Sequence, residues 1–195
     1  MDAGAAKHIA SLCTLDGLCE VVEIGAGTGG LTRALLAAGA RVTAVEIDPE
    51  LVSLLRSQAG LAAARIVCAD GLEFDYAGAV GGGAWCAAGN LPYNVATPLV
   101  VGWLTKPPAP QRIVVMVQRD VADRFIAKPG SAAYGSLSLL VRYYALARRA
   151  FVLGPGAFYP RPRVDSAVVV LERRSEPAVG AVSYTHLTLP TILLV

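Results

Sequence analysis

The chain has 195 residues, of which 54% carry hydrophobic side chains and 16% are charged, and its formal net charge is +2. This composition excludes a disordered protein, because there are enough apolar residues to bury one good core. The chain has no uninterrupted run of about 18 apolar residues and no signal-peptide pattern at its N-terminus, so we expect a cytoplasmic protein without a membrane span.

Short runs rich in β-branched and apolar residues recur along the chain and are typical of strands. Seven such runs comprise residues 20–24, 41–46, 65–69, 84–89, 111–117, 150–153 and 167–172. The fifth run is almost entirely apolar, as expected for a central parallel strand that is covered on both faces. The last two runs flank turns rich in Gly and Pro, and this late strand pair indicates one reversed edge strand.

Helical patterns separate most of these runs. Leu31, Leu35 and Leu36 recur at helical spacing after the first strand, and Asp48 and Pro49 begin the next helix as its N-cap and first-turn residue. Further helices are expected at residues 96–105, with Pro98 near the start, at 121–127 and at 137–146. The expected inward-facing residues are Leu51, Leu54 and Leu55 in the second helix and Leu139, Leu140 and Tyr143 or Tyr144 in the last. This alternation predicts an α/β fold with a doubly wound, mostly parallel sheet of seven strands.

A glycine loop follows the first strand. Gly25, Gly27 and Gly29 let the backbone approach a ligand closely, and the helix N-terminus behind them presents free N–H groups. Gly30 completes a G-x-G-x-x-G pattern, and Glu46 lies about 20 residues onward at a strand end, where a ribose-binding acid belongs. The loop alone therefore leaves a dinucleotide and S-adenosylmethionine open.

Three further residues favour S-adenosylmethionine. Glu23 lies two residues before the first glycine, where an acid can meet the cationic methionine end of that cofactor but would repel a pyrophosphate. Asp70 follows the third strand and is placed for the adenine amino group, and Asn90 follows the fourth, beside the expected sulfonium. All of these positions are carboxyl ends of strands, where ligands of open sheets bind.

The turn Asn90-Leu91-Pro92-Tyr93 is suited to hold a planar amine. The Asn90 side-chain oxygen and the Leu91 carbonyl can accept both hydrogens of an exocyclic amine, so that its lone pair turns toward a methyl donor. Pro92 lacks an N–H that would compete for these acceptors, and Tyr93 offers a face on which a base can stack. In-line transfer from sulfonium depends on holding the partners in contact, and it requires neither a metal nor a strong general base.

The cysteines and histidines do not indicate a metal site. None of the cysteine spacings is C-x-x-C, and two of the four cysteines lie in apolar strand-like runs where a buried free thiol is the usual occupant. These residues are Cys13, Cys19, Cys68 and Cys86, together with the isolated His8 and His186. We expect no bound metal and no disulfide.

The net charge conceals an asymmetry between the two halves of the chain. Residues 1–105 hold 5 Lys or Arg against 10 Asp or Glu, whereas residues 106–195 hold 12 against 5. A polyanion that docks on the second half would gain from counterion release. Charge alone does not separate such a partner from ordinary solvated surface arginines.

Several stretches in family order resemble the ribosomal RNA adenine dimethyltransferases, especially the small-subunit type. They cover roughly residues 7–175, and the last three are far more specific than the glycine loop. They are residues 22–29 (VEIGAGTG), 45–48 (VEID), 90–98 (NLPYNVATP), 116–122 (MVQRDVA), 133–138 (AYGSLS) and 156–166 (GAFYPRPRVDS).

The resemblance implies a Rossmann-like S-adenosylmethionine-dependent methyltransferase that dimethylates two adjacent adenines of small-subunit ribosomal RNA. It implies cofactor contacts by Gly25, Gly27, Glu46, Asp70 and Asn90, with the target amine held by Asn90, Leu91 and Tyr93. Phe158 would stack on the flipped-out adenine, and Arg161 and Arg163 beside it would bind RNA. The implied partner is small-subunit ribosomal RNA or an immature small ribosomal subunit, bound by a monomer.

The resemblance also sets the expected domain limits. Residues 1–175 are expected to form the methyltransferase domain without the basic N-terminal arm that is usual in the family. Residues 176–195 are expected to be a non-native or disordered tail in place of the family's C-terminal helical domain, and the string from Val182 onward fits no expected element.

Three alternatives remain beside this interpretation. The large-subunit enzymes of the macrolide-resistance type share the Asn-Leu/Ile-Pro-Tyr turn, although the AYGSLS and GAFYP stretches favour the small-subunit type. An RNA-binding assembly factor with an idle cofactor site is the second alternative, and the intact Glu46, Asp70 and Asn90 argue against lost chemistry. A small-molecule dehydrogenase is the third and weakest, and it would bind NAD.

Overall fold

The computed structural model describes residues 2–14, 20–157 and 164–178. Its sheet has seven strands in the order β3-β2-β1-β4-β5-β7-β6. The strands are β1 (Glu20–Ile24), β2 (Arg41–Glu46), β3 (Arg65–Cys68), β4 (Trp85–Asn90), β5 (Arg112–Gln118), β6 (Ala145–Leu153) and β7 (Ser166–Arg173). All neighbours pair in parallel except β7, which is antiparallel to both β5 and β6. The predicted mostly parallel sheet with one reversed strand is confirmed, and β7 lies next to the outermost strand, β6.

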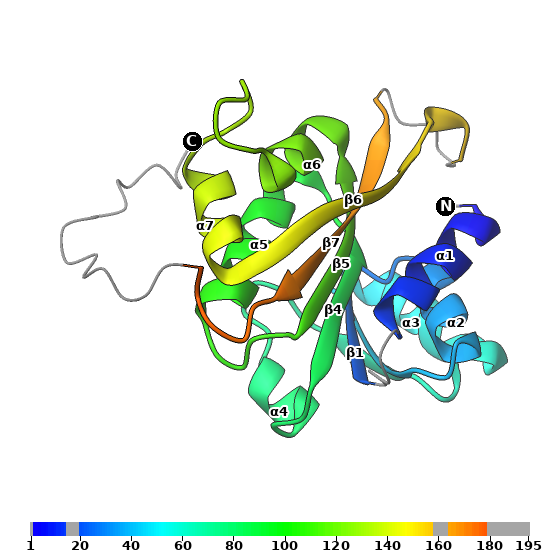
Figure 1. Ribbon diagram of the computed structural model, residues 1–195. Coiled ribbons are helices and arrows are strands. Elements are labelled where there is room, and N and C mark those ends of the chain that lie inside the picture. The colour runs from blue at the N-terminus through cyan, green and yellow to red at the C-terminus, as the bar shows by residue number, and fades with distance from the viewer. Residues whose placement is uncertain (1, 15–19, 158–163, 179–195) are drawn as a thin grey trace.

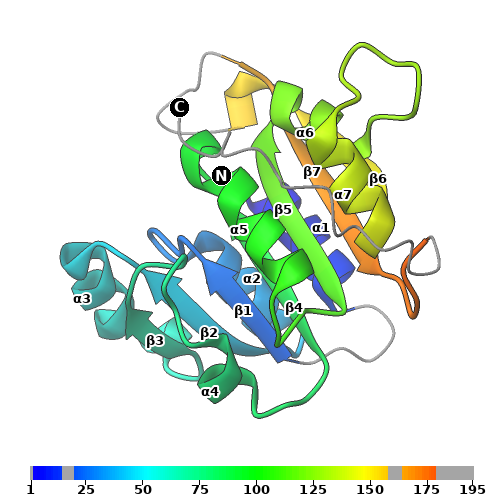
Figure 2. The same ribbon diagram turned by 90° about the vertical axis from the view of Figure 1, so that its left-hand side faces the viewer.

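Helices cover both faces of the sheet, as a doubly wound fold requires (Figures 1 and 2). The helices are α1 (Ala3–Cys13), α2 (Gly30–Ala37), α3 (Pro49–Ser57), α4 (Tyr76–Val80), α5 (Tyr93–Thr105), α6 (Arg119–Ile126) and α7 (Ser136–Tyr144). One hydrophobic cluster joins the sheet to α1, α2 and α3, and a second joins it to α4, α5, α6 and α7. Within the described residues, no helix has both the length and the apolar composition needed to cross a bilayer.

The position of the central strand β5 and the N-cap of α3 agree with the prediction from the local sequence. Strand β5 is buried along nearly its whole length between β4 and β7, which confirms the central position predicted from its apolar residues. Asp48 caps α3, because its Oδ1 accepts the Glu50 N–H at 2.8 Å, and Pro49 is in the first turn. The side chains that α3 buries are Val52 and Leu55, three residues apart, whereas Leu54 is 45% exposed, so its predicted inward position was wrong.

Other boundaries differ because pairing between distant strands overrides local propensity. Strand β6 begins at Ala145, five residues earlier than predicted, because Ala145 pairs with Arg173 of β7. Helix α7 therefore ends at Tyr144, and it buries Leu137, Ser138 and Val141, whereas the predicted Leu139 is 48% exposed.

Two helices differ from the prediction, one in where it begins and one in that it was not predicted. Helix α5 begins at Tyr93, three residues earlier than predicted, so Pro98 lies inside it. Helix α4 was not predicted, because five residues are too few to show a period; Asp75 caps it by accepting the Gly78 N–H at 3.1 Å.

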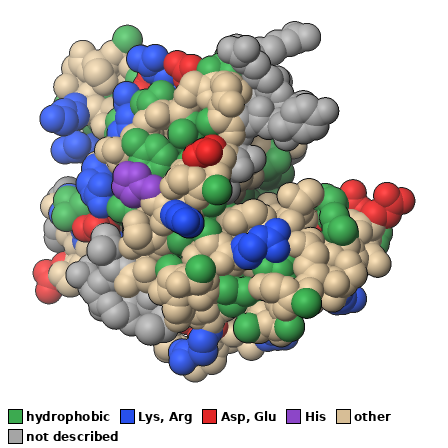
Figure 3. Space-filling model, turned by 90° about the vertical axis from the view of Figure 1, so that its right-hand side faces the viewer, with side chains coloured by type: hydrophobic (Ala, Val, Ile, Leu, Met, Phe, Trp, Pro, Cys, Tyr) green, Lys and Arg blue, Asp and Glu red, His purple; other side chains and the backbone are tan. Residues whose placement is uncertain are grey.

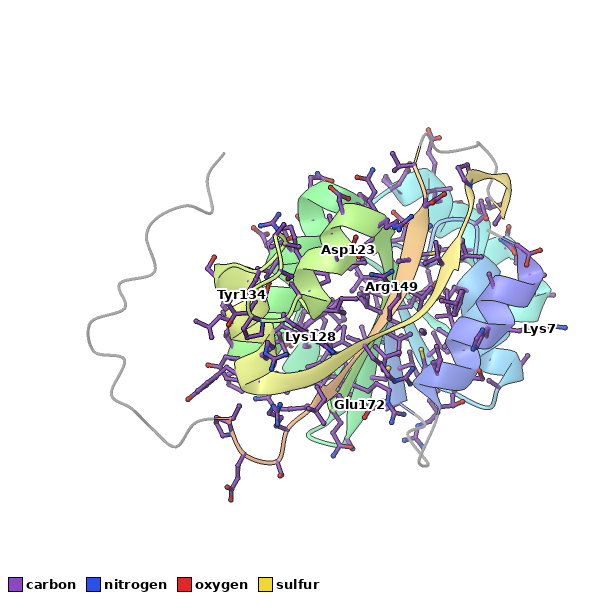
Figure 4. The ribbon with its side chains drawn as sticks, turned by 45° about the horizontal axis from the view of Figure 1, so that its top comes forward. Lys7, Asp123, Lys128, Tyr134, Arg149 and Glu172 are labelled. Atoms are coloured by element: carbon purple, nitrogen blue, oxygen red, sulfur yellow. The ribbon has the colours of Figure 1, made fainter. Side chains whose placement is uncertain are left out.

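The outermost strand is tied to the helices on both sides. Asp123 of α6 and Arg149 of β6 point toward one another and form an ion pair (Figure 4). On the other face, the His8 ring of α1 stacks on Phe151 of β6, with centroids 4.4 Å apart. These contacts fix β6 to the helices on both faces of the sheet.

Candidate active site

The glycine loop between β1 and α2 adopts backbone angles that favour glycine. Gly25, Gly27 and Gly29 have φ angles of +73°, +57° and +82°. The Gly25 N–H donates to the Val45 carbonyl at 2.9 Å, and Gly29 is the N-cap of α2. The loop is therefore held against the end of β2, with the N-terminus of α2 directly behind it.

Gly29 is constrained by packing as well as by its φ angle. A Cβ at this position would lie 2.6 Å from Leu61 Cδ1 and 2.9 Å from Leu55 Cδ2, and both leucines are fully buried. We expect Gly29→Ala to lower the free energy of unfolding by about 2–4 kcal/mol, because left-handed strain and overpacking add.

Gly39 provides a matched control for that measurement. Its φ angle is +85°, but a Cβ there meets no atom within 4 Å. Gly39→Ala should therefore cost only the backbone strain, roughly 1–2 kcal/mol. Urea unfolding of both variants measures the difference, and equal losses would show that the contact with Leu55 and Leu61 is unimportant.

Glu46 links the glycine loop to the end of β2. Its side chain is 7% exposed. Its Oε2 accepts the Gly27 N–H at 2.8 Å, and its Oε1 accepts the N–H groups of Ile47 at 2.9 Å and Asp48 at 3.2 Å. Hydrogen bonds to an ionised acceptor are stronger than neutral ones. The carboxylate is therefore fixed in one orientation at the strand end.

The ends of β3 and β4 supply the remaining polar groups. Asp70 is exposed just after β3, and its Oδ1 accepts the Leu72 N–H at 2.8 Å, which closes a tight turn. Asn90 is the last residue of β4 and its side chain is exposed. The buried Leu91 is anchored by its N–H, which donates to the Met116 carbonyl at 2.9 Å, and Pro92 is the N-cap of α5.

A cavity of about 310 Å³ brings these groups together at the carboxyl ends of the strands. Five predicted site residues line it, namely Gly25, Glu46, Asp70, Asn90 and Leu91. Gly27 and Gly29 do not line it, but Gly27 is bonded directly to Glu46. Tyr93 begins α5 beside the cavity wall at Pro92, and its side chain lies outside the described part of the structure.

Sequence reasoning missed the apolar walls of this cavity. Ile47 and Leu72 line it and are 64% and 48% exposed, although large apolar side chains are usually buried. Each follows a strand-end acid within two residues, and that position is the signal that could have identified them. Val95 and Leu99 of α5 also line it.

The predicted role of Glu23 is not supported by its position. Its side chain is 1% exposed, does not line the cavity, and accepts a hydrogen bond from Thr32 Oγ1 of α2 at 2.6 Å. Side chains alternate between the faces of a strand, so Glu23 points away from the face that carries Ile24, which does line the cavity. Burial raises the pKa of Glu23 to about 8, which favours the protonated carboxyl.

Comparison with known proteins gives a consistent assignment. The family model for ribosomal RNA adenine dimethylase matches residues 2–191. A ribosomal RNA small subunit methyltransferase A of Caulobacter vibrioides is 44% identical over 173 residues, which are 88% of this chain and 67% of that protein. The protein of the same name from Xanthobacter autotrophicus is 45% identical, over 84% of this chain and 59% of that protein.

The chain belongs to the ribosomal RNA adenine dimethylase family. It spans about three-fifths to two-thirds of the length of these two relatives.

Solved structures support the same fold for this dimethylase-family chain. The crystal structure of the 23S rRNA methyltransferase ErmE matches with a TM-score of 0.79 and 27% identity, over 93% of this chain and 72% of that one. A dimethyladenosine transferase from Plasmodium falciparum matches with a TM-score of 0.77 and 24% identity, over 88% and 62% of the two chains. The predicted Rossmann-like methyltransferase fold is confirmed.

Three residues that the family resemblance implied lie outside the described residues, namely Phe158, Arg161 and Arg163. The described residues on either side of them are anchored. The Ala157 carbonyl accepts the Asp2 N–H at 2.8 Å, and the Asp165 carbonyl accepts the Arg119 N–H at 3.0 Å. The Asp165 carboxylate also lies 3.5 Å from the Arg119 guanidinium, at the start of α6.

A second, larger cavity of about 540 Å³ lies between the α4 region and α5. It contains none of the predicted site residues, but it shares Gly71, Leu72 and Leu99 with the first cavity. The loop after β3 therefore separates the two cavities.

Across the described part of this dimethylase-family chain, no group of three His, Cys, Asp or Glu residues could hold a metal ion.

Proposed function

We propose that this chain transfers methyl groups from S-adenosylmethionine to the exocyclic amines of two adjacent adenines in small-subunit ribosomal RNA. The observation that carries the proposal is the position of Asn90 on the wall of the cavity that also presents Gly25, Glu46 and Asp70. The relatives named ribosomal RNA small subunit methyltransferase A, at 44% and 45% identity, support this substrate.

The cavity fits S-adenosylmethionine. Its volume of about 310 Å³ is at the lower end of the roughly 300–1,000 Å³ that is usual for small-molecule sites. Glu46 keeps acceptor capacity for a ribose hydroxyl, because an ionised carboxylate offers about four lone-pair sites and three are used. Ile47 and Leu72 provide apolar contacts for an adenine ring whose amino group meets Asp70. Gly25 carries no side chain that would obstruct the methionine part.

When bound, the cofactor supplies an electrophilic methyl group on positively charged sulfur. The residues of the chain position the amine. The Asn90 oxygen and the Leu91 carbonyl accept the two amine hydrogens, which turns the nitrogen lone pair toward the donor. Pro92 offers no competing N–H. The proton on nitrogen becomes acidic only as the new bond forms, so positioning is the main contribution of these residues.

The target base must leave its stack before this chemistry. We assign Tyr93 and Phe158 to the two faces of the extruded adenine and Arg161 and Arg163 to the RNA backbone. The excess of Lys and Arg in residues 106–195 supports an RNA partner. We propose that this partner is an immature small ribosomal subunit and that the chain binds it as a monomer in the cytoplasm. Figure 3 shows one face of the molecule, where Lys and Arg side chains lie at several points with Asp and Glu between them. Among the side chains described on this face, charge alone therefore does not delimit an RNA-binding surface.

The large-subunit alternative has one observation in its favour, the structural match to ErmE. That match is at 27% identity, whereas the small-subunit relatives are at 44% and 45%. Comparing labelled methyl incorporation into small and large ribosomal subunits that lack the modification separates the two. Incorporation into the large subunit alone would reverse the assignment.

Cofactor binding can be tested without RNA. In calorimetric titrations, we expect S-adenosylhomocysteine to bind and NAD not to bind. Glu46→Gln should weaken binding by about 10- to 100-fold, because a hydrogen bond to a charged acceptor is lost and an amide NH₂ faces the Gly27 N–H. Glu50→Gln, an exposed acid in the first turn of α3, is the control and should bind as the unaltered chain does. NAD binding with no S-adenosylhomocysteine binding would favour a dehydrogenase.

A further inference from the structure

Tyr76 lies six residues after Asp70 and is held in a cluster of aromatic rings. Its ring centroid is 5.5 Å from that of Trp85, in a stacked arrangement, and 6.2 Å from that of Trp103, edge to face. Phe74 contacts it edge to face at 5.1 Å. Aromatic rings at these separations attract one another and pack in defined orientations. The ring therefore has a fixed position in the wall of the larger cavity.

The Tyr76 hydroxyl reaches back to the loop that forms the cofactor cavity. It donates to the Gly71 carbonyl at 2.7 Å. Burial raises the pKa of Tyr76 to about 12, so the hydroxyl keeps its proton and remains a donor throughout the neutral range. The contact links the residue next to Asp70 with a rigid aromatic cluster.

Gly71 is also held by close packing. A Cβ on Gly71 would lie 2.6 Å from Ile24 Cγ2 and 3.5 Å from Leu99 Cδ2, so the main chain rests directly on these side chains. Both of them line the cofactor cavity. The Ala69 N–H donates to the Glu46 carbonyl at 3.0 Å, which fixes the start of the loop. Asp70 is thus the exposed residue between two anchored positions.

We propose that the Tyr76 hydroxyl is a positioning group that holds the Asp70 carboxylate where it meets the adenine amino group of the cofactor. The inference rests on the proposed function. Tyr76 does not line the cofactor cavity, and it acts through the Gly71 carbonyl. Without this hydrogen bond the Gly71 carbonyl loses its fixed direction. The turn in which the Leu72 N–H donates to the Asp70 carboxylate is then held less firmly.

Tyr76→Phe tests the role, because it removes the hydroxyl and keeps the ring. Calorimetry should compare S-adenosylhomocysteine with S-inosylhomocysteine, in which an oxo group replaces the adenine amino group. We expect the variant to bind S-adenosylhomocysteine about five- to tenfold more weakly and S-inosylhomocysteine within about twofold of the unaltered chain. Tyr144→Phe, whose ring contacts Tyr143 and Arg173, is the control and should change neither value.

A second arm places the same change in an Asp70→Ala background. If Tyr76 acts through Asp70, the additional change should then weaken S-adenosylhomocysteine binding by less than about twofold, because coupled residues are not additive. Equal weakening of both ligands, additive effects in the double variant, or unchanged binding in Tyr76→Phe would each overturn the positioning role. Failure of the unaltered chain to bind S-adenosylhomocysteine would instead overturn the proposed cofactor site itself.

Discussion

Replacing Asn90 with Ala is expected to lower the rate of methyl transfer by about 10²- to 10³-fold, the loss typical of removing one group that stabilises a transition state. The Asn90 side chain is exposed at the end of β4, so the fold should not depend on it. The measurement is incorporation of labelled methyl groups into small ribosomal subunits that lack the modification. Urea unfolding of the same variant should match that of the unaltered chain.

Gln111→Ala is a suitable control for this experiment. Gln111 also carries an exposed amide, but it precedes β5 at the amino end of the strand, opposite the cavity. Its replacement should leave methyl transfer unchanged. Turnover of Asn90→Ala equal to that of Gln111→Ala would refute the amine-holding role of Asn90.

The second large effect concerns the pH dependence of stability. The pKa of Glu23 is raised from its ordinary value of 4.5 to about 8 by burial. Between these two values the folded chain holds a proton that the unfolded chain has released. Stability from this group is therefore complete below about pH 4.5 and is lost as the pH rises toward 8. The loss across this range amounts to at most about 5 kcal/mol.

Glu23→Gln should flatten this dependence, because an amide does not titrate. Chemical unfolding at several pH values between 5 and 8 measures how steeply the free energy of unfolding changes with pH. This slope is the quantity to compare between the variant and the unaltered chain. The Thr32 hydroxyl lowers the pKa of Glu23 by stabilising its charged form. Thr32→Val should therefore raise that pKa further. In that variant the fall in stability should extend to higher pH. An unchanged slope in Glu23→Gln would show that Glu23 is ionised in the folded chain.

Much of the site was predictable, because its residues lie at the ends of strands or just after them. The limits of β1 and β2 match the prediction residue for residue. Glu46, Asp70 and Asn90 were placed at strand ends by hydrophobic pattern alone, and parallel strands bring such ends to one edge of a sheet. The structure places all three in one cavity. Their roles remain predictions until ligand binding is measured.

Glu23 lies outside the lining of the cavity although it is close to the glycine loop along the chain. Its distance from Gly25 along the chain suggested that it belongs to the cofactor site, but the direction of a strand side chain is set by which face the strand buries. The same limit applies to Leu139, which has helical spacing but lies on the exposed side of α7. Periodicity gives the spacing of a face, whereas the neighbouring elements decide which face is buried.

By itself, the sequence determined the order of strands and helices, the glycine loop, the family resemblance and the residues that follow each strand, because these depend on local pattern and spacing. Only the tertiary structure decided that Glu23 is buried against Thr32, that Ile47 and Leu72 line the cavity, and that Tyr76 holds Gly71. These contacts depend on the strand order, which places β1 between β2 and β4, and on helix packing. Side-chain direction and contact between distant segments are set by that packing.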